Sequence, residues 1–167
     1  TTYGDYPTLL PNSKRDQTNG AFTGWMLLSY KKNATVSSSE ECMDVQTHRV
    51  DTGGKKVFEK ICYNAQNLTD EDIQSYWSAK TDKPGEWLQI DLGRKMRINA
   101  LQINYADHKA TQYNKAMDIY YQYQIFMSDD NQNWTLVVDK SKSDKDAPHD
   151  YLELTNSIEA RYIKMVN

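Results

Sequence analysis

The feature that most constrains the fold is an alternation of apolar and polar residues along much of the second half of the chain. Leu88, Ile90 and Leu92 alternate with polar residues until Gly93 ends the run. Similar alternation returns near residues 101–105, 121–128, 134–138, 152–154 and 163–165. In 121–128 we expect Tyr121, Tyr123, Ile125 and Met127 to face away from Gln122, Gln124 and Ser128. A period of two residues is typical of strands that bury one face. Several short strands at near-regular spacing, with turn residues between them, predict an antiparallel β-sandwich.

Helical patterns are weak by comparison. No stretch carries an apolar stripe at 3.6-residue spacing over three turns. Thr69–Asp72 could cap a helical turn before Ile73, but nothing periodic follows it. The short segment Ala34–Val36 instead adds a further strand. We therefore expect an all-β fold, and in segment 134–138 we expect Trp134, Leu136 and Val138 to share one face.

The amino-acid composition argues against a nucleic-acid-binding protein and against a membrane-spanning segment. A net charge of −3 argues against a nucleic-acid-binding protein, which would need a basic stripe. No apolar run approaches the roughly 20 residues of a membrane span. The chain has 12 Tyr and 4 Trp against 3 Phe, and such amphipathic rings suit both twisted sheets and the faces of sugars.

The 167-residue chain has the length of one domain. Residues 1–24 combine Pro, Gly and Asn without a sustained period, which predicts a linker or strap. The chain starts Thr-Thr-Tyr without a signal-peptide pattern, so we interpret it as a piece of a longer parent protein. Residues 25–167 would then form the folded domain.

The two cysteines, Cys42 and Cys62, flank a polar stretch that contains glycine. Neither belongs to a Cys-x-x-Cys or Cys/His metal spacing. A disulfide between them would fit an oxidising compartment and would stabilise the protein by roughly 3 kcal/mol. Two free thiols are the alternative.

Three segments carry a family pattern: residues 67–78 with Asp70 and Trp77, residues 85–93 with Trp87-Leu-Gln-Ile-Asp-Leu-Gly93, and residues 159–164 with Ala160-Arg-Tyr-Ile-Lys164. In this order they resemble the discoidin domain, also called the coagulation-factor type C or F5/8 type C domain, over about residues 34–167. The turn Asp130–Trp134 is similar to a family turn. The sequence around residues 24–30 and 106–111 is similar to that of discoidin modules found after glycoside hydrolases in polysaccharide-degrading gut bacteria.

The resemblance implies an eight-stranded jelly-roll β-sandwich of the galactose-binding type. It implies a non-catalytic carbohydrate-binding module of a bacterial glycoside hydrolase that tethers the parent's catalytic domain to a glycan, galactose-like or a plant or host polysaccharide. Its location would be extracytoplasmic: periplasmic, at the cell surface or secreted. The alternatives are a spacer that packs on the parent's catalytic domain and a protein or cell-surface adhesion module. Because relatives have one more strand after the Arg-Tyr-Ile segment, the final strand is expected to be missing here or supplied by something else, and residues 40–64 are longer than the family loop.

The resemblance also implies a structural Ca²⁺ site in the loop after residue 67. A hard cation takes six to eight oxygens, and the expected ligands are the Asp70 carboxylate, the Ser75 hydroxyl and the carbonyls of Asn67 and Asp72. Glu71 stands where relatives often have Gly, and Ser75 replaces Thr. The alternative is a tight turn in which Asp70 caps backbone N–H groups.

Sugar binding is expected on the loop between Tyr105 and Met117, which is polar and aromatic between two strong strands. A sugar site needs a ring for the C–H face and planar polar groups for the hydroxyls. The expected ligand-binding residues are Tyr105, Asp107, His108, Gln112, Tyr113 and Asn114. The alternative is an ordered loop whose polar groups satisfy its own backbone.

Enzyme motifs are missing from the sequence. It has no Gly-x-Ser-x-Gly elbow, no phosphate-cradling glycine loop and no His-Glu-x-x-His. His48, His108 and His149 lack partners at metal-ligand spacing, and Trp77, Trp87 and Trp134 lie in motifs where packing is expected. Paired carboxylates for glycoside hydrolysis stay open, because their spacing is set in space.

Overall fold

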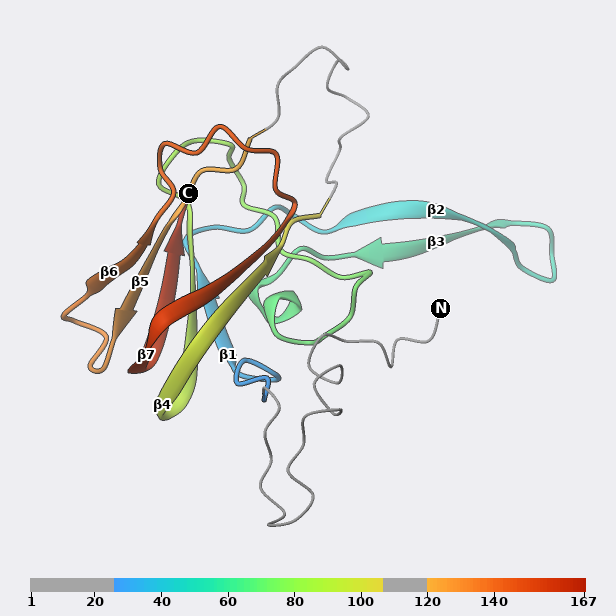
Figure 1. Ribbon diagram of the computed structural model, residues 1–167. Coiled ribbons are helices and arrows are strands. Elements are labelled where there is room, and N and C mark those ends of the chain that lie inside the picture. The colour runs from blue at the N-terminus through green and yellow to red at the C-terminus, as the bar shows by residue number, and fades with distance from the viewer. Residues whose placement is uncertain (1–25, 107–119) are drawn as a thin grey trace, which may run out of the picture.

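The computed structural model describes residues 26–106 and 120–167 (Figure 1). The predicted linker, residues 1–24, lies outside this part of the chain. The described elements are seven strands and one short 3-10 helix, in the order β1 (Asn33–Val36), β2 (Met43–Val50), β3 (Lys56–Ile61), η3 (Ala65–Leu68), β4 (Trp87–Asn104), β5 (Gln124–Ser128), β6 (Thr135–Asp139) and β7 (His149–Val166). Over the described residues no helix is long and apolar enough to cross a membrane.

The body is built on β4 and β7, which turn back on themselves together (Figure 1). Residues 87–91 of β4 pair with residues 162–166 of β7, and residues 100–104 pair with residues 149–153. The antiparallel register shifts twice between these stretches. The first stretch lies in the five-stranded order β1-β4-β7-β5-β6, which forms the larger layer. The second stretch, residues 100–104 paired with residues 149–153, forms the smaller layer and folds over the first. The fold is therefore the antiparallel, nearly all-β sandwich that the alternation predicted.

The bend in β4 is fixed by residues of the family motifs. Gly93 has φ +83°, a conformation that residues with a β-carbon rarely adopt, and its N–H donates to Asp91 Oδ1 at 2.8 Å. Arg161 Nε and Nη2 donate to Asp91 Oδ1 and Oδ2 at 2.8 and 2.9 Å. This two-pronged ion pair joins β4 to β7 where both strands turn. The Arg161 hydrogen bonds hold the pKa of Asp91 below its ordinary value.

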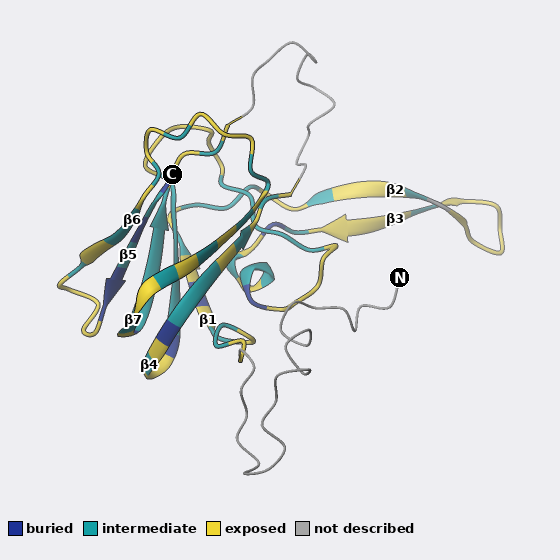
Figure 2. Ribbon diagram, viewed as in Figure 1, coloured by how far each residue is buried: buried dark blue, intermediate teal, exposed yellow. Residues whose placement is uncertain are grey.

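The core lies between the two layers (Figure 2). Its fully buried members are Leu92, Ile98, Met127 and Ala160. Tyr123, directly before β5, and Ile125 and Met127 within it are buried as predicted, whereas Ser128, which was expected on the opposite face, is buried too. The residues that pack around this centre are Leu28, Ile90, Met96, Leu101, Val137, Leu154, Ile158 and Ile163.

The faces expected for segment 134–138 are wrong in part. Val137 packs against the core, whereas Leu136 is 45% exposed. The reason is a register irregularity in the β5–β6 pair, where Ile125 lies opposite Val138 but Phe126 lies opposite Leu136. The residue skipped by this bulge, Val137, is turned inward, which alternation alone does not reveal.

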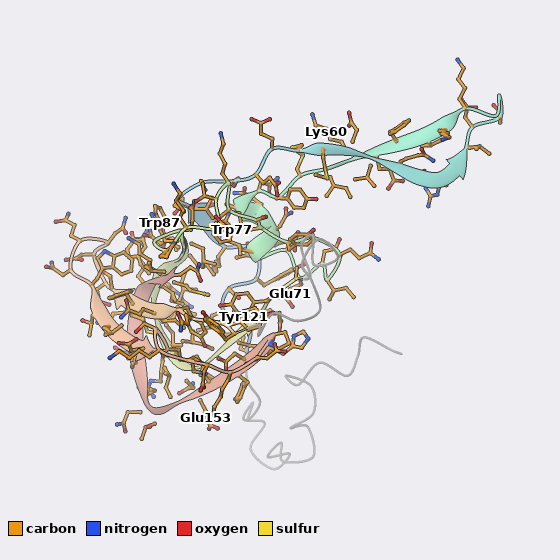
Figure 3. All side chains as sticks on the ribbon, turned by 90° about the horizontal axis from the view of Figure 1, so that it is seen from above. Lys60, Glu71, Trp77, Trp87, Tyr121 and Glu153 are labelled. Atoms are coloured by element: carbon orange, nitrogen blue, oxygen red, sulfur yellow. A yellow bond between two sulfur atoms is a disulfide. The ribbon has the colours of Figure 1, made fainter. Side chains whose placement is uncertain are left out.

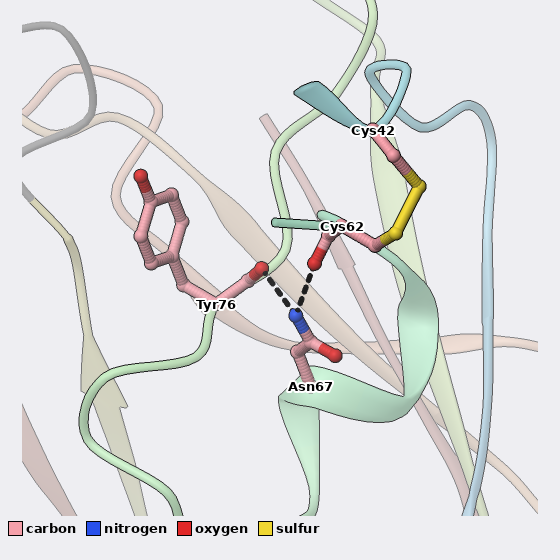
Figure 4. The surroundings of a disulfide bond; sticks show 4 residues. All are labelled: Cys42, Cys62, Asn67 and Tyr76. Carbon is pink, nitrogen blue, oxygen red and sulfur yellow. Dashed lines mark hydrogen bonds between the residues drawn. A yellow bond between two sulfur atoms is a disulfide. The ribbon is translucent and has the colours of Figure 1, made fainter. Parts of the chain in front are cut away.

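Residues 40–64 form a two-stranded ribbon, β2–β3, that projects from the sandwich (Figure 1). The disulfide Cys42–Cys62 closes its base, with an S–S distance of 2.10 Å and a Cα–Cα distance of 4.2 Å, so the disulfide alternative is confirmed. Asn67 Nδ2 donates to the carbonyls of Cys62 and Tyr76 at 2.8 and 2.9 Å, which fastens the ribbon base to the η3 loop (Figure 4). The ribbon itself was not predicted.

Candidate functional site

The predicted calcium loop brings three of its four expected ligands together. Ser75 Oγ donates to Asp70 Oδ2 at 2.6 Å, and it lies 3.3 Å from the Asp72 carbonyl. Asp70 Oδ1 accepts the Asp72 N–H at 3.0 Å. The fourth expected ligand is the Asn67 carbonyl; the side chain of the same residue donates its amide nitrogen to the carbonyls of Cys62 and Tyr76 at the ribbon base. A carboxylate, a hydroxyl and a carbonyl thus converge, and they also satisfy one another as a closed turn.

Glu71 completes this loop with φ +63°. This is the left-handed conformation that glycine adopts without cost, and relatives often have Gly at this position. Burial, and then the neighbouring Asp70 charge, raise the pKa of the Glu71 carboxyl. Two adjacent acids with a hydroxyl and a carbonyl are the oxygen donors that Ca²⁺ prefers, so the donor chemistry fits the ion. Among the described residues no group of three or more His, Cys, Asp or Glu side chains is placed to hold a metal, so any ion would need the loop carbonyls as well.

The predicted sugar loop falls mostly on residues that the structure does not describe. Asp107, His108, Gln112, Tyr113 and Asn114 lie outside the described residues. Tyr105 is described: its ring packs on Tyr121, with centroids 4.2 Å apart. Its hydroxyl is buried and has no hydrogen-bond partner among the described residues. Burial raises the pKa of Tyr105, so this hydroxyl stays protonated at neutral pH.

Both ends of this loop are fixed to one segment of the sandwich. The Tyr105 N–H donates to the Pro148 carbonyl at 2.8 Å, and the Tyr121 N–H donates to the Lys145 carbonyl at 3.2 Å. The rings of Tyr105 and Tyr121, tilted by 31° to one another, join the two ends; Figure 3 labels Tyr121 as seen from above. Tyr105 and Tyr121, which flank the residues outside the described part of the chain, are therefore held by one segment and by each other.

A polar network braces that base. Tyr123, which is 1% exposed, donates its hydroxyl to Asp150 Oδ2, and the Lys140 ammonium bonds the same oxygen. Burial works against the charged form of Asp150, but the hydrogen bonds from Lys140 and Tyr123 outweigh it and lower the pKa of this carboxyl. Burial and the Asp150 hydrogen bond raise the pKa of Tyr123. The network joins the residue before β5 (Tyr123), the residue after β6 (Lys140) and the start of β7 (Asp150) close to the loop ends.

The tryptophans described here take part in packing. Trp77 Nε1 donates to the Ser38 carbonyl at 2.8 Å. The Lys164 ammonium lies 4.9 Å from the ring centre of Trp87 and 4.4 Å from that of Trp134. Such cation–π contacts join β4, β7 and the start of β6 on the outer face of the larger sheet.

A group of polar residues that sequence reasoning passed over lies on the outer face of the smaller layer. Gln102 is opposite Tyr151, and Asn104 is opposite His149. All four are exposed. The alternation in 101–105 and 152–154 was the signal for this face, because it fixes which residues point away from the core.

Comparison with known proteins supports the fold and the family. The family model for the F5/8 type C domain matches residues 33–167. No curated protein matches the chain.

Solved structures with the same fold include several carbohydrate-binding modules. CpGH89CBM32-4 of Clostridium perfringens, solved with GlcNAc-α-1,4-galactose, has a TM-score of 0.59 and 15% identity, over 87% of this chain and 81% of that one. Chitosan-binding module 1 of a chitosanase/glucanase from Paenibacillus sp. IK-5 has a TM-score of 0.58 and 20% identity, over 86% of both chains. Module 2 of that enzyme, solved with chitotriose, has a TM-score of 0.57 and 19% identity, over 84% of this chain and 86% of that one.

The matched segment covers most of the chain and includes the Asp91–Arg161 pair and the two turned-back strands of the sandwich. The chain belongs to the F5/8 type C, or discoidin, domain family.

Proposed function

We propose that this chain is a non-catalytic carbohydrate-binding module that tethers a glycoside hydrolase to its glycan, with the loop 105–117 as the binding site. The observation that carries the proposal is the braced base: the rings of Tyr105 and Tyr121 pack on each other at a tilt on either side of a segment rich in rings and amides. Preorganised loop ends reduce the entropy lost on binding. The related modules in the comparison were solved with oligosaccharides, which supports this class of ligand.

Tethering explains how a weak binder is useful. A module that holds its parent on the substrate raises the effective concentration of the catalytic site without new contacts there. A disulfide is typical of oxidising compartments, and Cys42–Cys62 therefore supports an extracytoplasmic location, in the periplasm, at the cell surface or outside the cell.

The test is a glycan array and affinity electrophoresis of the whole chain, with Tyr113→Ala as the loop variant. Tyr30→Ala is the matched control, because Tyr30 is 46% exposed and pairs only with the Lys31 ammonium among the contacts described. We expect retardation in a glycan gel that Tyr113→Ala removes and Tyr30→Ala leaves unchanged. Retardation that survives Tyr113→Ala would place binding elsewhere, and no glycan signal at all would refute the proposed function.

We propose further that the Asp70 loop binds Ca²⁺ as a structural ion, with Asp70, Ser75 and the Asp72 carbonyl among its ligands and with the Asn67 carbonyl as the fourth. The bound ion would hold the loop between η3 and Trp77. Titration with Ca²⁺ after chelation, followed by thermal unfolding, tests this. An ion that binds only the native state raises the midpoint further as its free concentration rises above its Kd, and Asp70→Asn should abolish the rise. A midpoint that is the same with Ca²⁺ and with chelator would show that the turn satisfies itself.

A second candidate function is a contact with a neighbouring protein or with the parent's catalytic domain. The β2–β3 ribbon favours it, because Val50 and Phe58 are 65% and 58% exposed on an element that packs on no core. Cross-linking of the parent protein through the substitution Phe58→Cys would detect such a contact. A parent protein without ribbon cross-links would leave glycan tethering as the only candidate.

A further inference from the structure

The outer face of the smaller layer presents a ring beside a row of amide and imidazole groups. Outward positions on this ladder are Ala100, Gln102 and Asn104 on β4, and Glu153, Tyr151 and His149 opposite them on β7. The neighbours Leu101 and Leu154 point to the core. Tyr151 is 53% exposed, and Ala100 next to Gln102 is too small to cover it. Figure 3 labels Glu153 at this edge of the molecule.

Hydrogen bonds preorganise this row. Asn104 Oδ1 accepts Gln102 Nε2 at 3.2 Å and lies 3.1 Å from His149 Nδ1. Because that oxygen can only accept, the contact requires the hydrogen on Nδ1. Within the described residues this leaves three groups without a partner: the Asn104 amide nitrogen, the Gln102 amide oxygen and His149 Nε2. They are one donor and two acceptors, and each can pair with a sugar hydroxyl, which both donates and accepts.

We infer that this face, defined by Gln102, Asn104, His149 and Tyr151, is a second carbohydrate-binding surface, which stacks one pyranose ring on Tyr151 and hydrogen-bonds its hydroxyls through the amide row. This rests on the proposed function for the class of ligand, but it uses residues outside the loop 105–117. The patch measures roughly 7 Å along the strands and roughly 5 Å across them, which is about the footprint of one sugar ring.

The charge of this face restricts the class of sugar that it can bind. The six outward positions of this ladder carry no Lys or Arg, and Glu153 contributes a negative charge. A uronate or a sulfated sugar would meet this carboxylate without a cation to pair with, and like charges in close proximity repel. The ligand class is therefore a neutral sugar unit within a glycan chain. A module with two separate surfaces on one chain gains affinity for polysaccharides that reach both.

The experiment is affinity electrophoresis of the whole chain in gels that contain neutral β-galactan, hydroxyethylcellulose or polygalacturonate. The variants are Tyr151→Ala, Asn104→Ala and the ring-conserving Tyr151→Phe, with Tyr30→Ala as the exposed-tyrosine control. Thermal unfolding of each variant checks that it folds. Loss of one hydrogen-bonding or stacking group should weaken binding about 3- to 10-fold.

The inference predicts that Tyr151→Ala and Asn104→Ala are retarded less than the wild type in a neutral gel, that Tyr151→Phe and Tyr30→Ala are retarded as strongly as the wild type, and that polygalacturonate retards none. If Tyr151→Ala binds like the wild type while Tyr113→Ala does not, the proposed function stands and this second surface is refuted. Binding to polygalacturonate that exceeds binding to both neutral gels would also refute it. If the wild-type chain binds no gel and no array glycan, both the surface and the proposed function fail.

Discussion

The sandwich and the β2–β3 ribbon are stabilised in different ways. The sandwich buries Leu92, Ile98, Met127 and Ala160 between its layers and joins β4 to β7 by the Asp91–Arg161 pair. The ribbon has two strands and no second layer, and β-ribbons of this kind are marginal on their own in water. A covalent bond, Cys42–Cys62, closes it instead. The difference shows that burial of apolar side chains stabilises the sandwich, whereas the disulfide stabilises the ribbon that projects from it.

The largest expected effect is in the body. Leu92 is 1% exposed in the core cluster. Leu92→Ala should lower the free energy of unfolding by about 2–5 kcal/mol, because it removes buried methyl groups and leaves a cavity. Urea denaturation measures it. A loss below about 1 kcal/mol would show that the two layers are not packed at this point.

The disulfide comes next. Cys42→Ser with Cys62→Ser should lower the free energy of unfolding by about 3 kcal/mol, because the bond closes a loop with a sequence separation of 20 in the unfolded chain. Hydrogen exchange should quicken in β2 and β3 and change little in β4 and β7. Equal acceleration in both regions would contradict the separation of ribbon and body.

A substitution at the bend of β4 and β7 should reduce the free energy of unfolding less than the loss of core packing or of the disulfide. Asp91→Asn removes the charge that Arg161 pairs with, and it should cost about 1–3 kcal/mol of unfolding free energy, as for a hydrogen-bonded charged group. Denaturation at neutral pH measures the loss, and Asp129→Asn is the control because its ion pair with Lys95 is exposed. Equal losses in the two variants would refute a special role for the motif pair.

Low pH should reduce the free energy of unfolding of the sandwich through two carboxylates, those of Asp91 and Asp150. Asp91 and Asp150 have lowered pKa values in the folded state, so the stability that they contribute is present above the unfolded pKa of about 3.9 and is lost as the pH falls through the folded values. We expect the free energy of unfolding to fall below about pH 4, and to fall less steeply in Asp91→Asn. A wild-type curve that stays flat from pH 5 to pH 2 would contradict this.

The smallest effect is expected on the ribbon surface. Phe58 is 58% exposed, and Phe58→Ala should change the free energy of unfolding by less than about 0.5 kcal/mol, as for most surface substitutions. A loss comparable to that of Leu92→Ala would show that the ribbon packs on something that stabilises the fold.

Alternation was a sufficient guide where one face of a strand is buried. It correctly placed Tyr123, Ile125 and Met127 inside, and the family motif around Asp91 lies at the bend. It was wrong at Leu136, because a bulge reverses the face of a strand without changing its composition. The ribbon was missed for a related reason: both of its faces meet water, so no buried face marks Phe58 or Val45 as strand residues.

For the candidate sites too, the sequence predicted contacts within one loop but not contacts between distant strands. The convergence of Asp70, Ser75 and the Asp72 carbonyl followed from a family spacing within one loop. The row of Gln102, Asn104 and His149 joins strands that are 45 residues apart in the chain. Only the register of β4 against β7 brings these side chains together, and a single sequence contains no direct record of that register.

The most direct measurement of the central claim is glycan binding by two complementary variants of the whole chain. In one, a two-glycine link replaces residues 43–61, which the 4.2 Å Cα separation of Cys42 and Cys62 permits; in the other, Asp107→Ala and His108→Ala alter the loop. We predict that the ribbon deletion is retarded in a glycan gel as strongly as the wild type and that the loop variant is not. Binding that disappears with the ribbon and survives in the loop variant would contradict the account.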